Sequence, residues 1–204
     1  MAAEPKRQSR QRLPRAERRR LIEDHASTLL ALQGYDGTTL DQIARAAGVT
    51  KPVLYRHFPS KKELHLMLLA RHRDELLATL ADGLAGEGPL TARIREVADA
   101  WFAYVEDHPF AWAMLFQETT GDAEIQAFHR GMQTIARRAL VALISAEPEL
   151  DIPEQQMLVL AEFVRSGMTG LALWWLDHKD VPRSTLVEVV VGLVEHGLLG
   201  RDGR

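Results

Sequence analysis

Residues 39–58 read TLDQIARAAGVTKPVLYRHF, and the spacing of small and apolar residues in this stretch predicts a helix-turn-helix. The small side chain of Ala44 would allow the two helices to cross closely at this position, where a larger side chain would push them apart. Gly48 would supply the left-handed backbone conformation that reverses the chain at no steric cost. Leu54 would fill the small core between the helices, together with Ile43, Ala47 and Phe58.

The same stretch carries signals for where its helices begin and end. Thr39 and Gln42 fit a capping box, in which each side chain bonds the other residue's backbone N–H. Thr50 is expected to cap a short second helix that Pro59 terminates. Helical spacing recurs along the rest of the chain without strand-like alternation, so we predict an all-α fold. The other helices are expected from Pro14 to Gly34, from the Ser60–Glu63 capping box onward, and near 90–107, 109–118, 122–146, 154–178 and 184–199.

Charge is distributed unevenly along the 204 residues. The chain has a net charge of −3, but residues 1–62 carry +7 and the remainder carries −10. This split indicates that the basic N-terminal part binds a polyanion and that the acidic remainder does not. The run from Lys6 to Arg20 is either a solubilising tail or an arm that contacts DNA. The two interpretations are compatible, because such arms often order only on binding.

Composition excludes several classes of site. The chain has no cysteine, which rules out disulfides, thiolate zinc sites and a cysteine nucleophile. His65 and His72 are not part of an HExxH motif, and GxSxG and P-loop motifs are absent, so we expect no catalytic residues, metal site or cofactor. The apolar stretch from Ser166 to Leu176 is too short to span a bilayer and is expected to be buried in protein. With a charged start unlike a signal peptide, the sequence favours a cytoplasmic protein with no membrane partner.

Residues from about Arg15 to Leu68 resemble the DNA-binding domain of the TetR (tetracycline repressor) family of bacterial transcriptional regulators. The matching residues are Gly34-Tyr35, Thr38-Thr39, Ile43-Ala44, Ala47-Gly48-Val49, Leu54-Tyr55, His57-Phe58 and Ser60-Lys61-Lys62-Glu63-Leu64. Beyond residue 85 the resemblance is architectural only. It implies a three-helix DNA-binding domain followed by a helical domain for ligand binding and dimerisation. The expected boundaries are 1–14 for a flexible basic arm, 15–75 for the DNA-binding domain and 76–204 for the body.

The resemblance implies that the helix beginning at Thr50 enters the major groove of DNA. The expected contact residues are Thr39, Thr50, Lys51, Pro52, Val53, Tyr55, Arg56, His57 and Lys61. Lys51 would reach guanine, and Val53 would contact a thymine methyl group. Thr39 and Lys61 would grip the DNA backbone, because helix N-termini favour anions. Tyr55 and His57 would bond phosphates and set the docking register.

Four of these residues have a second interpretation. Tyr55 could instead be a core residue with only its hydroxyl free, and His57 could be an ordinary histidine at a helix end. Pro52 stands where many family members carry glycine, and its missing N–H puts a backbone contact there in doubt. Arg56 points either to phosphate or to solvent.

Aromatic residues and methionines concentrate beyond residue 100. In the family, the C-terminal helices enclose a ligand cavity, and apolar walls with a few polar groups suit such a site. Core packing explains more than half of this set. The expected lining residues are Trp101, Tyr104, Trp112, Phe116, Met132 and Trp174, with Gln117 and Arg165 as polar groups for an unidentified small-molecule effector.

The last two helices, near 155–178 and 184–199, have the small and apolar residues of a homodimer interface. The resemblance implies that they pair with their symmetry mates into a four-helix bundle. Two recognition helices one DNA turn apart would then read a palindromic operator. A bound ligand would shift the helix that opens at Ser60 and spoil this spacing. The expected function is therefore that of a ligand-responsive repressor.

Two alternatives come from other functional classes. An all-helical enzyme that transforms a small molecule would reveal itself by turnover of a bound metabolite. A non-specific architectural DNA binder would lack the large acidic, aromatic-rich body, and it would not retard one promoter fragment selectively.

Overall fold

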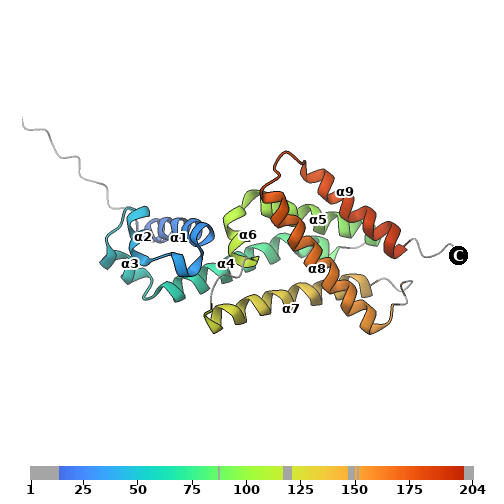
Figure 1. Ribbon diagram of the computed structural model, residues 1–204, viewed down its shortest axis with the longest axis horizontal. Helices are drawn as coiled ribbons and strands as arrows, with labels where there is room; N and C mark the ends of the chain where they lie inside the picture. The colour runs from blue at the N-terminus through green and yellow to red at the C-terminus, as the bar shows by residue number, and fades with distance from the viewer. Residues whose placement is uncertain (1–13, 87, 117–120, 147–149, 151, 200–204) are drawn as a thin grey trace, which may run out of the picture.

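The structure, a computed structural model, describes residues 14–86, 88–116, 121–146, 150 and 152–199. Within them the chain forms nine α-helices and a terminal π-helix, with no strand (Figure 1). The elements are α1 (Arg15–Gly37), α2 (Leu40–Ala46), α3 (Lys51–His57), α4 (Lys61–Ala85), α5 (Leu90–Asp107), α6 (Pro109–Phe116), α7 (Ala123–Ser145), α8 (Glu154–Leu176), α9 (Arg183–Val194) and η1 (Glu195–Leu199). The predicted all-α fold is confirmed.

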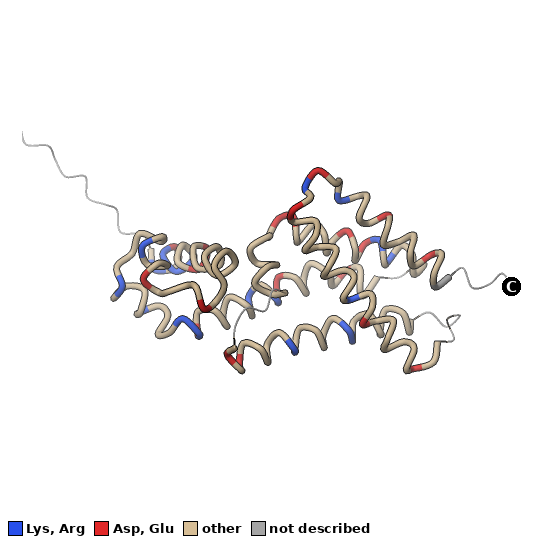
Figure 2. Tube along the Cα trace, viewed as in Figure 1, with Lys and Arg blue, Asp and Glu red and all other residues tan. Residues whose placement is uncertain are grey.

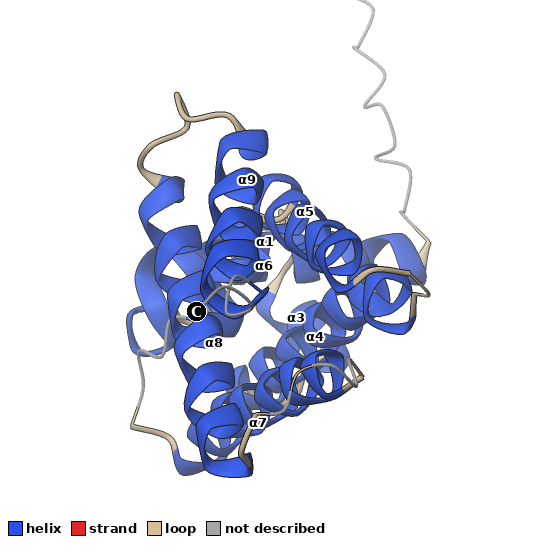
Figure 3. Cartoon of the chain, turned by 90° about the vertical axis from the view of Figure 1, so that its right-hand side faces the viewer, coloured by secondary structure: helices blue, strands red, loops and turns tan. Residues whose placement is uncertain are grey.

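The molecule is elongated, with α1–α3 at one end and α5–α9 at the other (Figure 1). α4 runs from the small end into the body, where α5 packs against both α4 and α9, and α7 packs against α8. Figure 3 views the body from its far end. The expected boundary after residue 75 falls inside this unbroken helix, so α4 belongs to both halves.

Local chemistry accounts for the helix-turn-helix. The Thr39–Gln42 capping box is present, with the Gln42 N–H donating to Thr39 Oγ1 over 3.2 Å and the Thr39 N–H donating to Gln42 Oε1 over 2.7 Å. Gly48 has φ 62, the left-handed conformation that the turn requires. Thr50 precedes α3 but makes no side-chain capping bond, contrary to expectation. Pro52 has no backbone N–H and cannot donate a hydrogen bond. The N–H of the next residue, Val53, donates to the Thr50 carbonyl.

Helix α8 is far less buried in one chain than its apolar sequence suggests. It is long and apolar enough to cross a membrane, judged by length and composition alone, and little of that window is buried. Within one chain, the expectation that the stretch from Ser166 to Leu176 is buried in protein holds only for part of it. Ala172 and Trp175 face the core, whereas Gly167 and Gly170 are exposed. One face of α8 covers the body, and the opposite face is uncovered.

Candidate DNA-binding surface and effector cavity

Helix α3 is anchored on one side and free on the other. Leu54 is fully buried, and Phe58 follows it into the core formed by α1 and α2. The outward residues are Thr50, Lys51, Pro52, Tyr55 and Arg56, whereas Val53 and His57 are half-buried at the edge of the helix. Figure 2 shows the basic residues of α1, α3 and the start of α4 at this end of the molecule.

Lys51 and Tyr55 point outward, as a DNA-contacting role requires. The Lys51 ammonium lies 2.9 Å from Asp41 Oδ1 on α2 and 5.9 Å from the ring centre of Tyr55. Hydrogen bonding to Asp41 raises the pKa of Lys51, so this side chain is charged at neutral pH. Both partners of the ion pair are more than half exposed, so water screens the attraction between them. Lys51 can therefore leave Asp41 for a phosphate or a base at little cost.

His57 lies beside the arginines at the start of α1. Burial lowers the pKa of His57, and the positive charges of Arg15, Arg19 and Arg18 lower it further. The imidazole is therefore neutral at neutral pH, and it would meet a phosphate as a hydrogen-bond donor without a charge.

Lys61 is engaged within the chain. Its ammonium donates to the carbonyl oxygens of Tyr35 over 2.6 Å and Thr38 over 2.8 Å, and it lies 4.1 Å from the centre of the Tyr35 ring. These contacts tie the start of α4 to the end of α1. The expected phosphate contact of Lys61 stays a prediction, and sequence reasoning missed this structural role.

A cavity of about 130 Å³ lies within the body, between α4, α5, α7, α8 and α9, with the end of α6 also on its wall. Its wall is almost entirely apolar. The lining residues are Leu76, Leu77, Leu80, Leu84, Ile94, Val97, Ala98, Trp101, Phe116, Met132, Ile135, Ala136, Ala139, Leu140, Leu143, Ile144, Val164, Arg165, Met168, Thr169, Val190 and Val194. Most of them are aliphatic residues spaced three or four apart on α4, α5 and α7. This helical spacing was visible in the sequence, but the prediction was based on the aromatic residues.

Four of the expected lining residues lie on this wall, namely Trp101, Phe116, Met132 and Arg165. Tyr104, Trp112 and Trp174 do not, and the expectation is wrong for them. Tyr104 is buried between α4 and α5. Trp112 is a core residue that stacks on Phe116 from outside the cavity. Trp174 lies on the outer face of α8, with its ring against His178. Gln117 lies outside the described residues. Residue type alone does not say which way a helix is turned.

Arg165 brings little net charge to the cavity. Its guanidinium donates to the Glu162 carboxylate, with Nε 3.1 Å from Oε2, and to Ser166 Oγ over 2.9 Å. The hydrogen bond from Arg165 lowers the pKa of Glu162, so the pair remains ionised at neutral pH. Because the two charges cancel locally, the wall offers an entering ligand almost no uncompensated charge.

The outer face of α8 and α9 carries an exposed apolar stripe. Val159 is 70% exposed and Phe163 is 72% exposed on α8, while Leu193 is 68% exposed on α9. A Cβ added at Gly167 or Gly170 would meet nothing within 4 Å in the chain. Packing inside one chain therefore gives no reason for two glycines in a helix, where each costs about 1 kcal/mol relative to alanine.

These two halves match known sequence families separately. The model for bacterial regulatory proteins of the tetR family matches residues 22–67, and the model for the Tetracyclin repressor-like C-terminal domain matches residues 90–197. The chain belongs to the TetR family. The first match contains the predicted motif at 39–58, and the second spans all the helices that follow α4.

Relatives of this TetR-family chain agree with the assignment. The transcriptional activator FasR of Mycolicibacterium smegmatis is 29% identical over 188 residues, which are 92% of this chain and 85% of FasR. A TetR-like regulator from Rhodococcus sp. RHA1 has the same fold, with a TM-score of 0.79, 22% identity and coverage of 93% of this chain and 100% of that one. AibR, solved in complex with isovaleryl coenzyme A and operator DNA, has a TM-score of 0.70, 21% identity and coverage of 86% and 97%.

The protein is therefore a DNA-binding transcriptional regulator of the TetR family, with a helix-turn-helix domain and a helical C-terminal domain. The relatives are described as regulators and not as enzymes. A match to the C-terminal domain also argues against a bare architectural DNA binder, which would need only the first domain.

Proposed function

We propose that the protein is a repressor that binds a palindromic operator as a homodimer and releases it when an apolar effector enters the cavity. The observation that carries this proposal is the position of α4. Its C-terminal half lines the cavity with Leu76 and Leu80, and Lys61 in its first turn binds the end of α1 in the DNA-binding domain. A change in the cavity wall therefore acts on the helix that positions α3. We place this activity in the cytoplasm, where the operator DNA is.

The wall of the cavity indicates the chemistry of the effector. A cavity of about 130 Å³ is close in size to the engineered apolar cavity of about 150 Å³ that binds benzene. Because the wall is apolar and Arg165 is already paired with Glu162, the group that enters should be an uncharged hydrocarbon of about five or six carbons. The acyl group of isovaleryl coenzyme A, bound by AibR, is of this kind.

The exposed stripe on α8 and α9 supports the homodimer. Large side chains at Val159 and Phe163 precede the exposed Gly167 and Gly170, which would let a second helix approach closely. We propose that the same face of a second copy packs here, as a closed two-fold interface requires. The two α3 helices would then reach successive major grooves of one operator.

Acyl coenzyme A probes test the effector proposal. The operator is first obtained by selecting random duplexes with the purified protein, and its complex is then titrated with isovaleryl and hexanoyl coenzyme A. We expect operator affinity to fall about 5- to 150-fold with at least one of them, the range of typical coupling energies. Free coenzyme A, which lacks the hydrocarbon, should leave affinity unchanged. An operator complex that survives both acyl probes and saturating benzene would contradict an apolar effector.

Lys51→Ala tests the DNA surface. Loss of a good base contact costs about 1–3 kcal/mol, so operator affinity should fall roughly 5- to 150-fold and sequence preference should relax. Lys179→Ala is the matched control, because it removes an exposed lysine from the turn after α8 without changing α3. Fluorescence anisotropy of labelled operator over a salt series measures both variants. Equal affinity of the Lys51 variant and the wild type at every salt concentration would remove Lys51 from the interface.

A further inference from the structure

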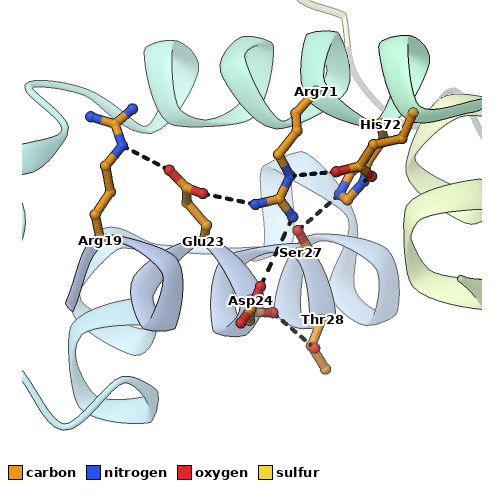
Figure 4. Close-up of polar contacts among 8 residues, drawn as sticks. Arg19, Glu23, Asp24, Ser27, Thr28, Arg71 and His72 are labelled. Carbon is orange, nitrogen blue, oxygen red and sulfur yellow. Dashed lines mark hydrogen bonds and ion pairs between the residues drawn. The ribbon is translucent and has the colours of Figure 1, made fainter. Parts of the chain in front are cut away.

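A buried polar cluster joins α1 to α4 (Figure 4). Glu23 on α1 is 6% exposed, and its carboxylate accepts from Arg19 over 2.9 Å and from Arg71 of α4 over 2.7 Å. His72, the residue after Arg71, lies against Ser27 of α1, with Nε2 3.2 Å from Oγ. This cluster determines how the DNA-binding domain sits on α4.

Hydrogen bonds determine the proton positions of His72. Nδ1 lies 3.1 Å from Glu75 Oε2, and a carboxylate only accepts, so Nδ1 carries the proton. Burial lowers the pKa of His72, which makes the neutral ring the stable form, and Nε2 therefore accepts from the Ser27 hydroxyl. His72 is thus bonded to a second helix through its side chain.

The backbone of His72 is bonded to a third helix. The hydroxyl of Tyr104 on α5 donates to the His72 carbonyl oxygen over 3.1 Å, and Tyr104 is buried. Burial raises the pKa of Tyr104, which keeps the hydroxyl protonated as a donor. In an α-helix the same carbonyl also accepts from the N–H four residues later, which here belongs to Leu76 of the cavity wall.

Tyr104 lies one helical turn beyond the cavity wall on α5. Ile94, Val97, Ala98 and Trp101 line the cavity from one face of this helix, and Tyr104 follows Trp101 by three residues on the same side. Because both residues belong to α5, a group that shifts this helix at Trp101 would also shift the Tyr104 hydroxyl relative to His72. The path from cavity to DNA-binding domain runs along α5 from Trp101 to Tyr104, and then through two hydrogen bonds of His72, one to Tyr104 and one to Ser27.

We propose that Tyr104 is a positioning residue that transmits occupancy of the cavity to the DNA-binding domain through its hydrogen bond to His72. This proposal rests on the proposed function, because it assumes that filling the cavity weakens operator binding. It adds the specific bond through which α5 acts on α1. Tyr104 itself touches neither the effector nor the DNA.

The test fills the cavity with a side chain, so that no effector is needed. Ala136→Phe on α7 places a ring in the cavity, and we expect it to lower operator affinity at least tenfold in the otherwise native dimer. In the Tyr104→Phe background, which lacks only the hydroxyl, the same filling should lower affinity less than threefold. Tyr35→Phe also deletes a phenolic hydroxyl but keeps the ring and the carbonyl that contact Lys61, and the effect of filling should persist in that background. Fluorescence anisotropy of labelled operator gives all six affinities.

Each outcome decides between the proposals. An undiminished effect of filling in the Tyr104→Phe protein overturns the role of Tyr104 and leaves the proposed function standing. If filling leaves operator affinity unchanged in the native background, the proposed function fails and the role of Tyr104 fails with it. Ala139→Leu, a smaller filling on the same helix, replaces Ala136→Phe if that variant does not fold. A purely structural role of Tyr104 would lower the melting temperature without changing the ratio between filled and unfilled proteins.

Discussion

Replacing Phe163 with glutamate is expected to separate the proposed dimer into monomers and to reduce operator affinity by a factor of about 100 or more. Phe163 is 72% exposed in one chain, and the proposed interface would bury it. A two-fold interface places each substitution twice, so two carboxylates would lose their water without a partner. Once the subunits separate, each half-site binds alone, and the avidity of a bivalent contact, about 10²- to 10⁴-fold, disappears. Analytical ultracentrifugation at micromolar concentration and operator anisotropy measure the two effects.

Phe110→Glu is the matched control for this variant. Phe110 is also an exposed phenylalanine, but it belongs to α6 and is not part of the exposed stripe on α8 and α9. The same chemical change there should leave the dimer intact. A Phe163→Glu protein that sediments as a dimer would show that the exposed stripe is covered by something other than a second copy.

Arg71→Met is expected to lower the free energy of unfolding by about 3 kcal/mol, because it leaves the buried Glu23 carboxylate without its closest cation. Removing one partner of a buried ion pair costs much more than removing one of a surface pair. For a protein of this size the loss corresponds to a fall of about 6–12 °C in the melting temperature. Thermal unfolding followed by circular dichroism at constant protein concentration measures it.

Arg73→Met provides the comparison on the same helix. Arg73 pairs with Asp74, whose side chain is well exposed, so its loss should cost about 1 kcal/mol or less. Combining Glu23→Leu with Arg71→Met removes both charges and should recover most of the stability. Equal melting temperatures for the Arg71 and Arg73 variants would mean that Glu23 does not depend on Arg71.

The helix-turn-helix was predictable because its determinants are close together in sequence. The Thr39–Gln42 capping box, the left-handed Gly48 and the buried Leu54 each act within about fifteen residues, where helix geometry alone decides which side chains meet. The exposure of Lys51 and Tyr55 follows from the same geometry, because Leu54 must point the other way. The engagement of Lys61 was not predictable, because it depends on how the end of α1 docks on α4.

The residues that line the cavity, in contrast, could not be predicted from local sequence. Its wall comes from six helices, and each contributes the face that its rotation about its own axis directs inward. Aromatic character suggested Trp174, which faces outward, and Trp112, which packs behind Phe116, while the aliphatic residues of α4 and α7 form most of the wall. Rotation is decided by the summed packing of neighbouring helices, and no single residue encodes it.

The sequence by itself determined the all-α class, the helix-turn-helix and the TetR-family resemblance, because capping, turn and spacing signals act over one or two helical turns. Only the tertiary structure decided which residues surround the cavity, which face of α8 is left uncovered, and that Tyr104 bonds His72 across α5 and α4. These features depend on contacts between residues tens of positions apart, whose formation reflects the packing of the whole body.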